Sequence, residues 1–187
     1  MIRIPGDRPL RASKLSRVPR IEARDVQAVW PAVRALKPAA LLIDIEPFVA
    51  VWRTDESALL RGLHEQLDQC ATIASVREVI FVTNSDRSPS GGVPSTSFPA
   101  SYISRARKPF LDISRFASLP SPLIVIGDQV LTDGLMAWRV NATFVQVPLP
   151  ARISLGVRAQ CLLGRIVGSL FFRRLETANS SSGEDGR

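Results

Sequence analysis

Short runs of apolar residues alternate with longer amphipathic segments along most of the chain. Continuous apolar runs of this length are typical of parallel strands that are buried on both faces. We expect strands at residues 39–43, 76–82, 101–104, 123–126 and 143–147. Helical spacing of apolar residues predicts helices over 21–36, 54–70, 109–116 and 132–139. This alternation predicts an α/β fold, with a doubly wound parallel sheet of about five strands and right-handed crossovers.

The two ends of the chain differ from this middle part. Residues 1–20 are rich in Arg and Pro and predict a basic, poorly ordered arm, so the α/β domain is placed at 21–150. Residues 151–176 predict a basic amphipathic helix, and the Ser-, Gly- and acid-rich residues 177–187 predict a disordered tail.

The net charge of +7 is carried by these ends. Residues 1–24 hold seven basic and two acidic residues, and residues 151–174 hold five basic residues and no acidic one. Basic ends around a neutral domain fit an anionic surface, either lipid or RNA. A nucleic-acid-binding protein would more often carry basic and aromatic residues across its folded domain, so nucleic acid is the less favoured partner.

The helical segment 153–175 therefore has three interpretations: packing on the domain, docking on an anionic membrane, or binding a protein partner. Cys70 and Cys161 lie far apart without metal-ligand spacing, which fits reduced thiols in a cytosolic protein. No apolar stretch typical of a signal peptide follows the charged N-terminus. We expect a cytoplasmic protein, with peripheral contact at the inner face of the membrane if the helix docks there.

Acidic residues follow two of the predicted strands. The predicted strand 39–43 is followed by Asp44-Ile45-Glu46. The predicted strand 123–126 is followed by Gly127-Asp128, and Asp133 comes five residues after Asp128. Open α/β sheets bind ligands at the carboxyl ends of their strands. Two strand ends loaded with acids predict a cation site with a reacting group beside it.

Two further polar signals fall between these acids, at Thr83-Asn84 and at Arg107-Lys108-Pro109. With them, the chain resembles the haloacid dehalogenase superfamily of phosphotransferases, and within it the YqeG-like branch that includes phosphatidylglycerophosphate phosphatases. The resemblance covers about residues 38–150. The matching segments are Ile43-Asp44, Trp52, Val82-Thr83-Asn84, Ala106-Arg107-Lys108-Pro109 and Gly127-Asp128-Gln129-Val130-Leu131-Thr132-Asp133.

The resemblance implies a Rossmann-like core without a separate cap domain, and a Mg²⁺-dependent phosphatase of phosphomonoesters. An uncapped site suits a large or membrane-held substrate such as phosphatidylglycerophosphate, although small soluble phosphate esters stay open. The resemblance implies that Asp44 is the nucleophile and that Glu46 is the general acid and base. It implies metal ligation by Asp44, the Glu46 carbonyl, Asp128 and Asp133. Thr83 and Asn84 would bind the phosphate, and Lys108 would bind it too and stabilise the charge on the transferring group.

The first motif departs from the family pattern. The family has Asp-x-Asp-x-Thr, whereas this chain has Glu46 and Phe48 at the second and third positions. Glu46 keeps the acid chemistry with one more methylene, and Phe48 lacks the hydroxyl. The alternative hypothesis is a catalytically degenerate relative that keeps the fold and acts through a partner protein.

Overall fold

A computed structural model describes residues 17–52, 54–149 and 155–175 of the 187-residue chain. The predicted arm lies outside the described residues as far as residue 16, and so does the predicted tail 177–187. Residues 151–154 and 176 of the predicted C-terminal helix also lie outside them.

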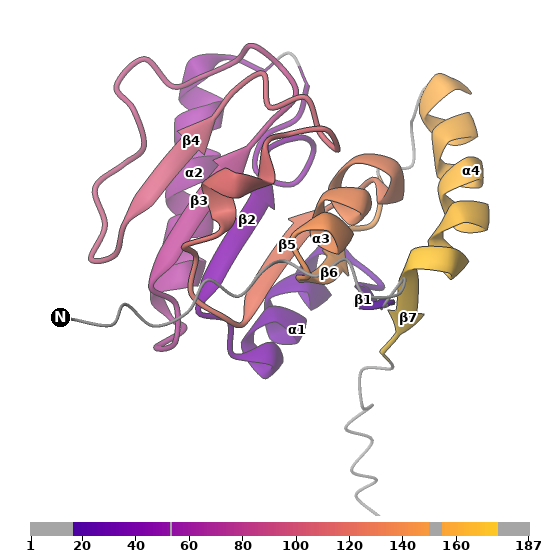
Figure 1. The fold of residues 1–187 in the computed structure, drawn as a ribbon. Helices are drawn as coiled ribbons and strands as arrows, with labels where there is room; N and C mark the ends of the chain where they lie inside the picture. The colour runs from indigo at the N-terminus through magenta and orange to yellow at the C-terminus, as the bar shows by residue number, and fades with distance from the viewer. Residues whose placement is uncertain (1–16, 53, 150–154, 176–187) are drawn as a thin grey trace, which may run out of the picture.

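The described strands form one sheet in which every neighbouring pair is parallel, in the order β4-β3-β2-β5-β6-β1-β7 (Figure 1). The prediction of a parallel α/β fold is confirmed. The strands are β1 (Val18–Glu22), β2 (Ala40–Asp44), β3 (Glu78–Val82), β4 (Ala100–Ile103), β5 (Leu123–Gly127), β6 (Thr143–Gln146) and β7 (Phe172–Arg174).

The predicted number of strands was wrong, since the sheet has seven. The two additional strands are β1 and β7, which pair with each other at one end of the sheet. In β1, Pro19 and Arg20 interrupt the apolar pattern, and β7 follows a helix directly without a turn residue. Neither segment therefore has the continuous apolar run by which the other strands are recognised.

The helical segments are η1 (Val26–Ala28), α1 (Val29–Leu36), α2 (Glu56–Ala71), η2 (Ile113–Phe116), η3 (Val130–Gly134), α3 (Leu135–Arg139) and α4 (Leu155–Phe171). Asp55 caps α2, because its side chain accepts a hydrogen bond from the backbone N–H of Ala58 at 2.8 Å. This agrees with the predicted helix start at residues 54–56.

Four predicted helix boundaries were wrong. Ile21 and Glu22 belong to β1, and the helical turns begin at residue 26. Of the segment 109–116, only the short 3₁₀ turn η2 is helical. The helix predicted to begin at Thr132 begins earlier, because Thr132 lies inside η3, a π-helical segment that begins at Val130. In the C-terminal helix, α4 ends at Phe171, because the next three residues extend to pair with β1.

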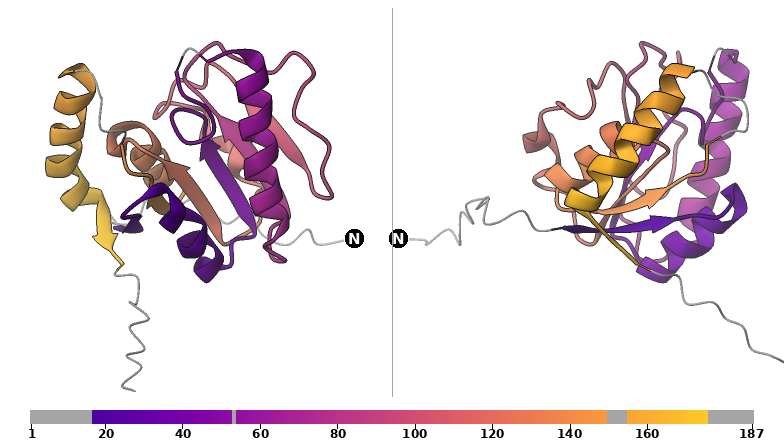
Figure 2. Two further views of the ribbon diagram at one scale, coloured as in Figure 1. Left: turned by 180° about the vertical axis from the view of Figure 1, so that it is seen from behind. Right: turned by 90° about the vertical axis from the view of Figure 1, so that its right-hand side faces the viewer.

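Helices cover both faces of the sheet (Figure 2). Alternate residues of β2 point to opposite faces, as expected for a strand. Leu41 and Ile43 pack with Val33 of α1 and Leu63 of α2, whereas Leu42 belongs to the core on the side of α3. Within the described residues, none of the helices combines the length and the apolar character needed to cross a membrane.

The strand order places the ends of β2 and β5 at the middle of the sheet. The chain runs from β2 through β3 to the edge strand β4, then returns to β5, which lies on the other side of β2. Such a reversal opens a crevice at the carboxyl ends of the strands. Residues 45–55, which connect β2 to α2, hold no helix or strand in their described part, and residues 83–99 hold none either.

Candidate metal centre

Three carboxylates meet at the carboxyl ends of β2 and β5. Asp44 is the last residue of β2, Asp128 follows β5 directly, and Asp133 lies in η3. Because β2 and β5 are parallel neighbours with Ile43 opposite Ile126, they end side by side. Each of the three aspartates offers a carboxylate oxygen, and these oxygens lie within 4.8 Å of one another. All three residues are buried, so the predicted acids share one small site.

A buried lysine lies against two of these carboxylates. Lys108 Nζ is 2.6 Å from Asp44 Oδ1 and 2.7 Å from Asp133 Oδ1. It also donates a hydrogen bond to the carbonyl oxygen of Val82 at 3.3 Å. Burial lowers the pKa of Lys108, but the two carboxylates outweigh burial and leave this pKa above its usual value. The site therefore holds a fixed positive charge beside its acids.

The carboxylate of Asp128 is buried without any hydrogen-bond donor among the described residues. Burial, and then the negative charge of Asp133, raise the pKa of Asp128 to about 7. The pKa of Asp44 is raised well above its usual range, first by burial and then by Asp133, against the opposing effect of Lys108. An unpartnered buried carboxylate is costly. Three carboxylates and one lysine leave excess negative charge, which fits a divalent cation bound through oxygen ligands.

Glu46 is held by hydroxyl groups and lies outside this carboxylate cluster. Its Oε2 accepts a hydrogen bond from Thr83 Oγ1 at 2.6 Å, and its Oε1 accepts one from Ser85 Oγ at 3.2 Å. Glu46 is buried, and its charge is a smaller cause of the raised pKa of Asp128, after burial and Asp133. Thr83, predicted to bind phosphate, thus directs its hydroxyl to Glu46.

Ser85 was not among the predicted site residues. The signal in the sequence was the second hydroxyl residue in Thr83-Asn84-Ser85, directly after β3. The structure brings both hydroxyls to Glu46.

Asn84 binds the backbone of Lys108. Its Oδ1 accepts the Lys108 N–H at 2.6 Å, and its Nδ2 donates to the Lys108 carbonyl oxygen at 3.3 Å. The two loops are joined further by Ala106 N–H donating to the Thr83 carbonyl at 2.9 Å. The observed contacts of Asn84, predicted to bind phosphate, therefore fix the backbone that carries the Lys108 ammonium.

Phe48 packs against the hydrophobic core. Its ring centroid lies 6.2 Å from that of Trp30 in α1. Phe48 is therefore a packing residue in this protein. Trp52, which belongs to the sequence resemblance, is 42% exposed.

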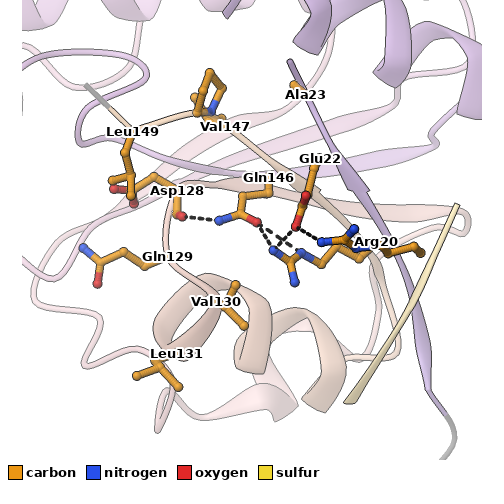
Figure 3. A pocket seen from close by; sticks show the side chains of 12 residues that line it. Arg20, Glu22, Ala23, Asp128, Gln129, Val130, Leu131, Gln146, Val147 and Leu149 are labelled. Carbon is orange, nitrogen blue, oxygen red and sulfur yellow. Dashed lines mark hydrogen bonds and ion pairs between the residues drawn. The ribbon is translucent and has the colours of Figure 1, made fainter. Parts of the chain in front are cut away.

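A cavity of about 480 Å³ opens beside Asp128 on the side of β6 and β1 (Figure 3). Gln146 Nε2 donates to the Asp128 carbonyl oxygen at 2.8 Å, and Gln146 Oε1 accepts from Arg20 Nε at 3.1 Å. Arg20 also pairs with Glu22. This chain of polar contacts fixes the backbone of Asp128 and forms one wall of the cavity.

Gly127 allows Asp133 to lie close to the end of β5. A Cβ atom at residue 127 would lie 2.4 Å from Cγ of Asp133, closer than real contacts permit. We expect Gly127→Ala to displace Asp133 and to lower the free energy of unfolding by about 1–3 kcal/mol. The measurement is thermal unfolding, with a loss of about 2–4 °C for each kcal/mol.

Gly91→Ala is the matched control, because a Cβ atom there meets nothing within 4 Å. Equal melting temperatures for Gly127→Ala and the wild type would show that the Asp133 position does not depend on Gly127.

No protein-family model, curated protein or solved structure matches this chain.

Proposed function

We propose that this protein is a Mg²⁺-dependent phosphatase of phosphomonoesters, of the haloacid dehalogenase type. The observation that supports the proposal best is the convergence of Asp44, Asp128 and Asp133 within 4.8 Å, with Lys108 against two of them. Phosphatidylglycerophosphate is the substrate that the sequence resemblance favours.

The three aspartates and the main-chain carbonyl of Glu46 would hold the ion. Oxygen ligands suit Mg²⁺, and the Asp128 carboxylate, buried without a donor, fits a cation partner. When bound, Mg²⁺ would offset the repulsion between an anionic phosphate ester and the carboxylates.

Asp44 is proposed as the nucleophile. Its carboxylate oxygen forms a bond to phosphorus, the bond from phosphorus to the substrate alcohol breaks, and Glu46 gives a proton to that alcohol. Glu46 then takes a proton from water, which attacks phosphorus and releases inorganic phosphate from Asp44. Lys108 stabilises the negative charge on the transferring group, since its ammonium is held beside Asp44 at 2.6 Å.

The test is phosphate release from p-nitrophenyl phosphate and from phosphatidylglycerophosphate in vesicles, with Mg²⁺ and with EDTA. We expect release with Mg²⁺, loss of release in EDTA, and recovery when Mg²⁺ is restored. Turnover that is equal in EDTA and in Mg²⁺ would contradict the proposal.

A second candidate, a catalytically inactive binding protein with this fold, is favoured by the contacts of Glu46. Both oxygens of its carboxylate accept hydrogen bonds from Thr83 and Ser85, as they would in a purely structural acid. This protein would bind Mg²⁺ and release phosphate from neither ester, so the same assay separates the two functions.

Mg²⁺ affinity is expected to rise as pH increases toward about 7. In the metal-free site, burial and then Asp133 raise the pKa of Asp128 to about 7. Below that pH the ion must displace a proton, so affinity should fall by up to about tenfold per pH unit. For the same reason, this group should make the metal-free protein less stable as pH rises from about 4 to 7.

Calorimetric titration with MgCl₂ in two buffers of different ionisation enthalpy measures both the affinity and the protons released. An affinity that is flat across this range, with no proton released, would contradict the placement of Asp128 in the metal site.

A further inference from the structure

α4 has one packed side and one exposed side. Gly164 and Gly168 lie on the packed side: a Cβ atom at Gly164 would lie 3.1 Å from Val130 Cβ, and one at Gly168 would lie 3.5 Å from Val130 Cγ1. The glycines thus let α4 approach η3 closely (Figure 1). Phe172, directly after the helix, is buried and pairs with Val18 of β1, which fixes the end of α4 on the sheet.

The other side of α4 carries four large apolar side chains in contact with solvent. They are Leu162, Leu163, Ile166 and Leu170, with exposed fractions between 51% and 65%. At roughly 100° per residue, they occupy one side of the helix, away from the two glycines. We call these four residues the α4 apolar face. Contiguous exposed apolar surface of this kind marks a binding surface in a folded protein.

The charge around the α4 apolar face favours an anionic lipid surface as its occupant. Residues 151–174 include five arginines and no acidic residue, and Arg173 and Arg174 are exposed just beyond the helix. A helix with an apolar side and cationic flanks lies in the interface of an anionic bilayer, where both apolar burial and charge contribute to binding.

The packing of α4 also connects this helix to the cavity beside Asp128. Val130 packs against α4 at Gly164 and Gly168, and it also lines the cavity. Arg174 of β7 lines the same cavity. The right-hand view of Figure 2 shows α4 along the outside of the molecule. A lipid surface bound by the α4 apolar face would lie on the opposite side of the helix from Val130 and this wall of the cavity.

We propose that the α4 apolar face docks this protein on anionic membranes. The proposal does not depend on the phosphatase activity.

The test is co-sedimentation of the full chain, without Mg²⁺ or substrate, with two kinds of vesicle. One kind is pure phosphatidylcholine, and the other contains about one third phosphatidylglycerol. We expect binding to the anionic vesicles that weakens at high salt. Because Ile166 and Leu170 are exposed, the double variant Ile166→Glu with Leu170→Glu should keep the wild-type melting temperature and bind at least about tenfold less.

Val26→Glu with Val51→Glu is the matched control, since the two valines are 54% and 56% exposed, lie outside α4 and together add the same two negative charges. It should bind as the wild type does. Equal binding of the double variant and the wild type, or no preference for anionic vesicles, would overturn the proposal. The proposal would also be overturned if the wild type formed a dimer in solution, the double variant were monomeric, and neither protein bound vesicles.

Discussion

Replacing Asp44 by asparagine is expected to lower Mg²⁺-dependent phosphate release by at least about a thousandfold. The amide cannot attack phosphorus as a carboxylate does, and it offers the ion a neutral ligand. Burial, and then Asp133, raise the pKa of Asp44, so a charged carboxylate is unfavourable there in the metal-free protein. A neutral amide avoids this cost, and the variant protein should therefore stay folded. Initial rates of phosphate release measure the loss of activity, and a melting curve measures whether the protein stays folded.

Asp68→Asn is the matched control for this variant. Asp68 is exposed on α2 and is not part of the carboxylate cluster, so its replacement should leave the rate unchanged. If Asp44→Asn turns over as fast as the wild type, Asp44 is not the nucleophile and the mechanism fails.

Replacing Lys108 by methionine is expected to lower the free energy of unfolding by about 3–5 kcal/mol at neutral pH in the metal-free protein. The methionine fills a similar volume but leaves Asp44 and Asp133 buried without their cation. Thermal unfolding should show a loss of about 2–4 °C for each kcal/mol.

Acid should reduce this loss. Without Lys108 the pKa of Asp44 would be raised further above its unfolded value of about 3.9, so the folded state binds a proton more tightly than the unfolded state. The cost is therefore smallest near pH 4 and grows as pH rises. Lys37→Met, at an exposed lysine outside the site, should leave the melting temperature near that of the wild type. An equally small effect for Lys108→Met would show that the buried ion pairs contribute little.

That the three aspartates lie together could be predicted from the sequence, because their position follows from simple strand geometry. Asp44 and Asp128 come directly after strongly apolar runs, and parallel neighbouring strands must bring such residues together. Asp133 comes five residues after Asp128, so a turn after β5 keeps its side chain near the end of that strand. Lys108 was identified through the family resemblance, since a lysine in a loop gives no local sign that it is buried.

The contacts between side chains could not be predicted in this way. Whether Asn84 meets a phosphate or the backbone of Lys108 depends on how two loops lie together, which a local pattern does not encode. The same holds for Glu46, whose hydroxyl partners lie almost 40 positions further along the chain.

The missed strands have another cause. β1 and β7 lie at one end of the sheet, and β7 is its edge strand, where continuous apolar character is not required. Segment 172–174 has two arginines among its three residues, and segment 18–22 has Pro19 and Arg20 at its centre, so neither shows a continuous apolar run.

The measurement that tests the central claim most directly is the detection of a phosphoryl group on Asp44. The protein is mixed with p-nitrophenyl phosphate and Mg²⁺, quenched in acid during turnover, and mapped by mass spectrometry of its peptides. We predict a phosphorylated peptide containing Asp44, which is absent in EDTA and absent in Asp44→Asn. Phosphate release without any label on Asp44, or a label on another residue, would contradict the account.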